Sequence, residues 1–247
     1  MKTMRYSLLL TVFCSFSSMA TIGISSMVEF TQDGDAQFTI SNSDDYRQFI
    51  SVAISSIKIE DGEMVKTPYS RENINTWSLT AHPARTVIDA KLSKDFKFTY
   101  QPLPSDSKEQ DKMYQVSFIP TPYFTEGEPA KHRVQMAIGF AAYVIVPAQT
   151  DQPLDYDVTY NGDSIQLNNH GNSYVRAYFD ACPDSVKGDA RKACSKVVYA
   201  MSGRRLNVTL TEEMQKKSVI KAELSTHHLT YKDKWVLQKD KTIRSKE

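Results

Sequence analysis

The sequence predicts an all-β protein built from many short strands. After residue 20 the apolar side chains recur mainly every second residue, which is the period of a strand with one buried face. Asp, Asn, Gly, Ser and Pro separate the apolar segments, as they do in sandwiches and barrels. The ten clearest strand candidates are residues 36–41, 49–59, 96–100, 114–119, 134–146, 164–167, 174–179, 197–201, 206–210 and 219–224. Helical periodicity is confined to weak windows such as residues 211–217, where Thr211 can cap a single turn.

Residues 1–20 have the pattern of a cleaved secretory signal peptide. Lys2 and Arg5 precede an apolar run at residues 8–16, and small residues follow up to Ala20. The run is shorter than the roughly 20 residues of a membrane-spanning helix, and no later window is apolar over that length. We therefore expect a secreted, soluble mature chain.

The 247 residues could form one large domain or two sandwiches of about 110 residues each. The best boundary is residues 147–153, where a long strand candidate ends and prolines flank a polar stretch. We predict an N-terminal domain at residues 21–150 and a C-terminal domain at 151–247. The irregular residues 102–111 are interpreted as a long loop inside the first domain.

The charge pattern argues against nucleic acid and anionic membranes as partners. The chain has 30 basic and 29 acidic residues, a formal net charge of +1, and most of these charges are interspersed. A small basic excess near the C-terminus is interpreted as a solvated tail.

The cysteines predict one disulfide. Cys14 lies in the predicted signal peptide, which leaves Cys182 and Cys194. Pro183, Gly188 and many polar residues lie between them, so in an oxidising compartment they are expected to close a surface loop. Free thiols and metal ligation are the alternatives.

No catalytic or metal-binding motif is recognisable in the sequence. It contains no nucleophile elbow, no zinc-protease motif and no phosphate-binding glycine loop. Of the five histidines only His227 and His228 are neighbours, and neighbours in a strand point to opposite faces. The histidines are interpreted as surface or turn residues. We therefore predict no enzymatic activity, no metal, no cofactor and no small-molecule substrate.

Residues 133–146 form the most informative strand candidate. Its large apolar side chains share one face, whereas the opposite face is small. The residues of this apolar stripe are Val134, Met136, Ile138 and Phe140. Such a stripe is commonly the core-facing side of a sandwich strand. It can also belong to an edge strand that lends its backbone hydrogen bonds and side chains to a partner.

The order of several segments resembles the periplasmic pilus-assembly chaperones, in particular the alternate class of the chaperone–usher pathway. The segments are residues 24–27, 38–43, 49–52, 96–100, 113–118, 138–144 and 167–172, with Cys182 and Cys194. Each segment is degenerate alone, and the likeness lies in their succession over nearly all of the mature chain.

The resemblance implies two immunoglobulin-like β-sandwich domains in a boomerang arrangement, with no enzymatic activity and a periplasmic location. It implies that the stripe of residues 134–140 completes the unfinished sandwich of a pilus subunit (a pilin), a mode called donor-strand complementation. An outer-membrane usher would then receive the complex, and the free protein could cap its own strand in a homodimer. The stripe fits this role, because an incomplete sandwich exposes apolar core.

One feature of the family does not transfer. Its members hold the subunit's terminal carboxylate with basic residues on the first strand and on the donor strand. Residues 22–30 and 134–146 contain neither Lys nor Arg. Arg47, Lys131 and Arg133 therefore serve as candidate anchors.

Two alternatives from other classes stay open. A fimbrial structural subunit or adhesin would share the fold class, although residues 21–35 are too short and polar for a donor arm. A periplasmic enzyme on a sandwich would need a catalytic cluster assembled from distant residues.

Overall fold

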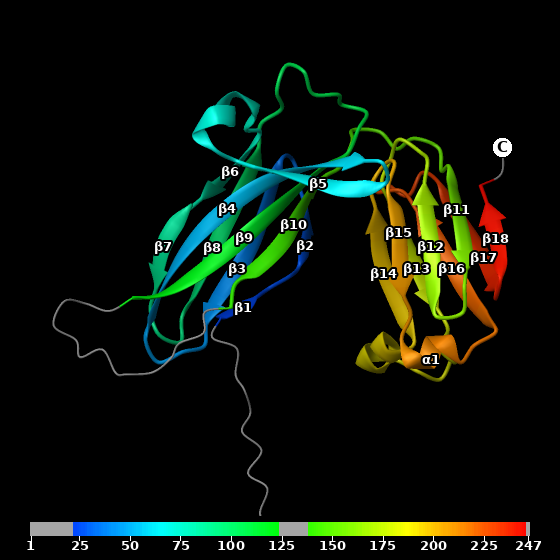
Figure 1. Ribbon diagram of the computed structural model, residues 1–247. Helices are drawn as coiled ribbons and strands as arrows, with labels where there is room; N and C mark the ends of the chain where they lie inside the picture. Colours follow the sequence, from blue (N-terminus) through cyan, green and yellow to red (C-terminus); the bar gives the residue numbers. More distant parts are fainter. Residues whose placement is uncertain (1–21, 124–137, 246–247) are drawn as a thin grey trace, which may run out of the picture.

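Each half of the chain forms two β-sheets that enclose one core (Figure 1). The computed structural model describes residues 22–123 and 138–245. In the first half one sheet has the order β1-β3-β8-β6, and the other has the order β2-β10-β9-β4-β5 with β7 also on β4. The second half has the sheets β15-β12-β11-β18 and β14-β13-β16-β17. We call these halves the first and second sandwich.

The elements of the first sandwich are β1 (Ile22–Ile24), β2 (Val28–Phe30), β3 (Asp35–Asn42), β4 (Arg47–Glu60), β5 (Glu63–Pro68), η1 (Arg71–Thr76), β6 (Leu79–His82), β7 (Arg85–Ile88), β8 (Ser93–Tyr100), β9 (Lys112–Tyr123) and β10 (Phe140–Val146). Those of the second are β11 (Tyr156–Tyr160), β12 (Ser164–Asn169), β13 (Val175–Asp180), η2 (Gly188–Ala193), β14 (Ser195–Ala200), β15 (Arg205–Thr209), α1 (Glu212–Gln215), β16 (Val219–Ser225), β17 (Lys232–Gln238) and β18 (Lys241–Arg244).

The alternation of apolar residues builds both cores. In the first sandwich Phe38, Phe96 and Phe118 are fully buried and pack edge to face with ring centroids 5.2 to 5.6 Å apart. In the second, Tyr156 is buried and its hydroxyl donates to the Asp233 carboxylate over 2.8 Å. Burying one large side chain of this kind contributes about 2 to 3 kcal/mol, so these layers account for much of the stability of each sandwich.

The predicted all-β fold class is confirmed. The irregular residues 102–111 connect β8 to β9 inside the first sandwich, and Thr211 caps α1 by accepting the Met214 N–H over 3.3 Å. The predicted signal peptide, residues 1–20, lies outside the described residues. The helices that the structure does describe have four to six residues, and none is long and apolar enough to cross a bilayer.

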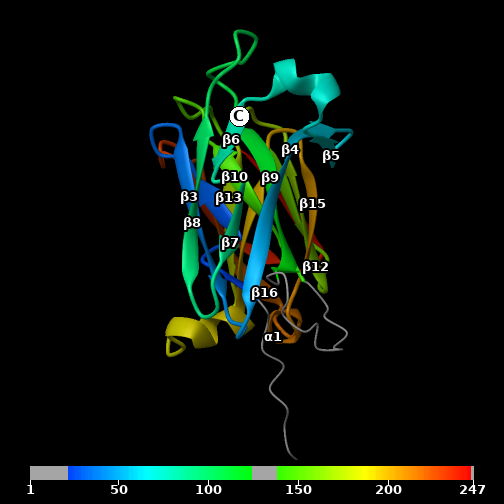
Figure 2. The same ribbon diagram turned by 90° about the vertical axis from the view of Figure 1, so that its left-hand side faces the viewer.

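The sandwiches are joined at one end and diverge toward the other (Figure 1), and Figure 2 shows the first in front of the second. Apolar side chains from both sandwiches meet at the joined end, where Met113 and Ile145 of the first pack with Tyr174 and Met201 of the second. Ile57 is also buried there. The two sandwiches therefore share a small core of their own.

A hairpin makes a second attachment, which we call the hairpin clasp. Asp61 and Gly62 both have positive φ, so β4 turns tightly into β5. The N–H of Arg205 donates to the Gly62 carbonyl over 2.9 Å, and the Arg204 guanidinium pairs with the Glu63 carboxylate over 2.6 Å. Gly62 has a φ of +83°, which strains any other residue, and a Cβ there would also lie 2.2 Å from Nε and 2.9 Å from Cγ of Arg205, so this turn favours glycine.

The predicted disulfide between Cys182 and Cys194 is present and closes the loop that carries η2. Arg191 organises the loop, because its guanidinium donates to the Val186 carbonyl over 2.9 Å and pairs with Asp180 over 2.5 Å. The bridge therefore holds a loop that its own side chains already order.

Replacing Cys182 and Cys194 by Ser should lower the free energy of unfolding of the second sandwich by about 3 kcal/mol, the chain-entropy estimate for a loop of this size. Urea titration followed by Trp235 fluorescence in a Trp77→Phe background measures this, because Trp235 packs against the second core. The converse background, Trp235→Phe, reports the first sandwich and should be unchanged. Equal midpoints for the second sandwich with and without the bridge would contradict the assignment.

Candidate functional site

Strand β10 is paired differently along its two edges. On one edge the whole strand pairs antiparallel with β9, from Phe140 opposite Phe118 to Val146 opposite Lys112. On the other edge β2 pairs parallel with residues 143–145 only. Among the described strands, residues 140–142 therefore have a partner on the β9 side alone, and we call residues 138–142 the open edge.

Two serines explain why β2 begins only at Val28 and leaves residues 140–142 of β10 without a partner on that side among the described strands. Ser25 still follows β3, since its N–H donates to the Thr39 carbonyl and its hydroxyl accepts the Thr39 N–H, each over 3.0 Å. The Ser26 hydroxyl then bonds both the N–H and the carbonyl of Val28, over 3.1 and 2.7 Å. The chain thus leaves one sheet and joins the other at this point. Hydroxyl bonds to nearby backbone commonly produce such bends.

The backbone of the open edge points toward solvent. The Tyr143 N–H donates to the Met27 carbonyl, and the Ile145 carbonyl accepts the Thr31 N–H, each over 2.9 Å. Alternate residues of a strand point their polar groups to the same edge. The N–H and carbonyl of Ala141 therefore point to this edge, just before β2 begins. An unpaired edge of this kind can accept a strand from another chain.

The side chains of residues 138–144 fit both interpretations of the apolar stripe, since some face the protein's own core and one is exposed and available to a partner. Ala142 and Val144 are fully buried in the core of the first sandwich, and Phe140 is partly buried against it. Ile138 is 63% exposed. By the two-residue period it continues the face of Phe140 beyond the end of the core. Val134 and Met136 lie outside the described residues.

Gly139 lies close to the backbone of β9. A Cβ built on Gly139 would lie 2.4 Å from the carbonyl oxygen of Phe118 and 3.3 Å from Cδ of Pro120. Because the nearest atom belongs to the backbone, a side chain here would require the strands to move apart. The small face noted in the sequence thus has a structural cause at this position.

Of the three candidate anchors, the described part of the chain includes Arg47. Arg47 begins β4 opposite Tyr123, and its Nε pairs with the Asp89 carboxylate over 2.8 Å. Lys131 and Arg133 lie outside the described residues.

Another cation, Lys66, lies on β5 of the sheet that contains β10, and its side chain reaches across β4 to β9. Its Nζ donates to the Gln115 amide oxygen over 3.1 Å, and the Gln115 amide nitrogen lies 3.4 Å from the Tyr143 hydroxyl. These three side chains extend from β5 across to β10. The sequence reasoning missed Lys66, because only the register of β5 on β4 brings it to this face.

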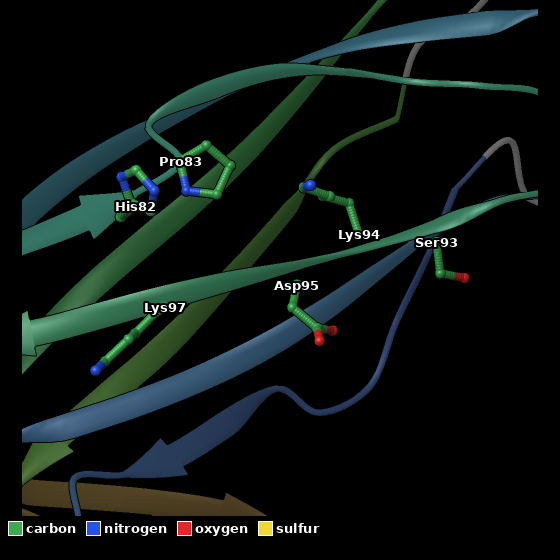
Figure 3. A pocket seen from close by; sticks show the side chains of 6 residues that line it. All are labelled: His82, Pro83, Ser93, Lys94, Asp95 and Lys97. Atoms are coloured by element: carbon green, nitrogen blue, oxygen red, sulfur yellow. The ribbon is translucent and has the colours of Figure 1, made fainter.

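The surface hollow drawn in Figure 3 does not form a site. Its side chains come from β8 and from the turn after β6, and they point in different directions. Lys97 pairs with Asp35 over 2.8 Å, which lowers the pKa of that carboxyl, and Asp95 accepts the Thr39 hydroxyl over 2.7 Å. In the described ranges no three His, Cys, Asp or Glu side chains are placed to hold a metal ion.

The interpretation of the histidines as surface or turn residues holds for His227 and His228. They lie in the turn between β16 and β17 and not in a strand, and their rings meet edge to face with centroids 4.8 Å apart. The alternation argument for their directions is therefore wrong for this pair.

The family is established by the sequence. The family model described as the CS5 fimbrial protein N-terminal domain matches residues 24–147, which is half of the chain. The chain belongs to this family. It is also 23% identical over 182 residues to an Escherichia coli protein described as an uncharacterized 25.9 kDa protein in the CS5 3′ region, covering 72% of this chain and 75% of that one.

Solved structures establish the fold. The chain is similar to a chain of the Salmonella enterica complex of SafA pilin with the SafB chaperone, with a TM-score of 0.51, 12% identity and coverage of 90% and 99%. It is also similar to a chain of the Acinetobacter baumannii CsuC–CsuE chaperone–tip adhesion subunit complex, with a TM-score of 0.50 and 12% identity, covering 90% of this chain and 100% of that one. The similarity to the periplasmic chaperone SfaE has a TM-score of 0.50 and 11% identity, covering 90% of this chain and 98% of that one. The resemblance to chaperones of chaperone–usher fimbriae is thus confirmed in the fold.

Replacing Gly139 by Val should separate the start of β10 from β9, because the new side chain meets the Phe118 carbonyl. Overpacking of this kind costs about 1 to 3 kcal/mol. Limited proteolysis should show faster cleavage around residues 138–142 than in the parent protein. The control Ser93→Val, at an exposed strand position, should leave that cleavage unchanged. Equal cleavage rates for Gly139→Val and the parent would contradict the close approach.

Proposed function

We propose that this protein is a periplasmic chaperone that binds a fimbrial subunit by adding its open edge to the subunit's unfinished sandwich, and then delivers it to an outer-membrane usher. The observation that supports this proposal best is the pairing of β10, in which residues 140–142 have, among the strands that the structure describes, a partner on only one side. The family and the fold support it further. The fold of the relatives does not favour a structural subunit or adhesin.

Both parts of the edge contribute to binding. The outward backbone groups at Ala141 would form ladder hydrogen bonds and so fix the register of the partner strand. The exposed Ile138 would enter the partner's core, and burying such a side chain contributes about 2 to 3 kcal/mol before the cost of association. We extend the stripe to Val134 and Met136 by the sequence pattern alone. A stripe of this size gives binding that another strand can still displace.

The partner follows from the relatives. SafB was solved with SafA pilin, and CsuC with the tip subunit CsuE. We propose pilus subunits as the partners of this chain as well, with no nucleic acid, cofactor or metal involved. We also propose that residues 1–20 direct export, that the domains are residues 21–150 and 151–247, and that no enzymatic step takes place. Self-capping in a homodimer stays a prediction.

A charged contact would add orientation to this binding. Arg47, Lys131 and Arg133 stay candidates for holding the subunit's terminal carboxylate. We add Lys66, because its ammonium lies on the same face as Gln115 and Tyr143, next to the strand that carries the open edge. Arg47 is the weaker candidate, since it already pairs with Asp89.

Changing Ile138 to Asp should abolish capture of the subunit, because an unpaired carboxylate would have to enter an apolar core. Ile138 is 63% exposed, so the free protein should keep its stability. The measurement is the yield of a soluble one-to-one complex when the mature chain is co-expressed with the subunit of its own fimbrial system.

The matched control is Val236→Asp, which places the same charge at a position 55% exposed on the second sandwich. It should capture the subunit normally. Normal capture by Ile138→Asp, with both variants folded, would refute the role of the open edge.

A further inference from the structure

A histidine lies in the joint between the sandwiches. The ring of His227, from the second sandwich, is 5.3 Å from the ring of Phe30 in the first. It is 5.9 Å from the ring of Tyr174, whose hydroxyl lies 2.6 Å from Nδ1 of His227. Phe30 also stacks on Tyr174 at 5.5 Å. These three side chains, with Asp111, are called the joint.

Asp111 connects the joint to the linker. Its carboxylate accepts the N–H of Tyr174 over 2.6 Å and the N–H of Ala148 over 2.8 Å. A single side chain next to β9 therefore holds both the linker and the second sandwich. Burial raises the pKa of this carboxyl in spite of the two hydrogen bonds.

Other charged or titratable groups surround His227. The Asp151 carboxylate accepts the Thr226 hydroxyl over 2.6 Å and the N–H groups of His228 and Thr230, and so holds the turn. The ring of His228 contacts that of His227, and its Nε2 lies 3.2 Å from the Ala148 carbonyl. Two further residues of the second sandwich act on the pKa of Tyr174, which Tyr199 raises and Arg176 lowers.

The geometry defines the protonation state of the joint. Burial raises the pKa of Tyr174, so its hydroxyl keeps its proton and shares a hydrogen bond with Nδ1 of His227, whose direction depends on the tautomer of the imidazole. Burial, and then the neighbouring His228, lower the pKa of His227 below 6.5, although Asp151 and Asp111 act in the opposite direction. In the imidazolium both ring nitrogens carry a proton, so Nδ1 of His227 can only donate to Tyr174 and a charge is placed among the buried rings.

We propose that His227 makes the joint sensitive to pH, so that its protonation releases the second sandwich from Phe30 while the hairpin clasp keeps the two sandwiches attached. The clasp is held by a backbone hydrogen bond and by the Arg204–Glu63 ion pair, and these contacts involve no histidine. The expected motion is thus a pivot about the clasp and not a separation.

The direction of the effect follows from the lowered pKa. Below pH 6.5 an open joint, with His227 in water, binds the proton more readily than the closed joint does. The contribution of His227 to closure is therefore complete above pH 6.5 and falls as the pH drops below it. Each unit by which closure lowers the pKa changes the ratio of closed to open molecules by about tenfold at low pH.

The test uses the free protein and is independent of subunit binding. Spin labels at Lys94→Cys and Lys241→Cys, exposed positions on the two sandwiches, report the distance between them at pH 7.5 and 5.5. We expect a narrow distribution at pH 7.5 and a second, shifted population at pH 5.5. In His227→Asn, which keeps an acceptor near the place of Nδ1 and does not titrate, the two distributions should be identical. His170→Asn, at an exposed histidine paired with Asp157, should respond like the parent protein.

An NMR titration of the His227 ring in the parent protein supplies a second readout that needs no variant. Its pKa should lie below 6.5, and the Phe30 and Tyr174 signals should shift with it. A pKa of 6.5 or above would overturn the proposal, because attraction of the imidazolium to Asp111, Asp151 and the rings would then outweigh burial. An unchanged distance distribution in the parent protein, or a response that His170→Asn removes, would also overturn it.

Discussion

The structure depends on the point at which the first strand segment, residues 22–30 with β1 and β2, passes from one sheet to the other. Ser25 is bonded to β3, and Ser26 turns the chain so that β2 meets β10 only from Tyr143 onward. Within the described part of the chain, one edge of β10 is therefore paired over its second half and unpaired over its first. If the first strand continued straight along β3, β10 would lack β2 altogether; if it joined β10 earlier, no edge would remain for a partner.

The sequence predicted the fold class well, because each apolar segment has a period of two and ends at turn residues. It also predicted the disulfide and the cap at Thr211 from local spacing. The site was harder to predict. The stripe shows which side chains share a face, but its open edge depends on the register between β2 and β10, which joins residues more than a hundred positions apart. Lys66 was missed for a similar reason, since it reaches Gln115 across β4.

The second sandwich is held to the first by unlike contacts. The hairpin clasp relies on backbone groups and an ion pair, whereas the joint relies on aromatic packing around a half-buried histidine. Sequence periodicity could not predict either one, because both form between residues from different sandwiches. His227 illustrates this, since in a strand it would have pointed away from its neighbour, and in the turn it contacts it.

The outward N–H of Ala141 has no strand partner within residues 22–123 and 138–245, and the proposed function requires that it stay unpaired until a partner strand arrives. Amide hydrogen exchange at Ala141 and Tyr143, before and after addition of a fimbrial subunit, tests it most directly, because Tyr143 already donates to Met27. The account predicts fast exchange at Ala141 in the free protein, slow exchange in the complex, and slow exchange at Tyr143 in both. Slow exchange at Ala141 in the free, monomeric protein, with no change on binding, would contradict it.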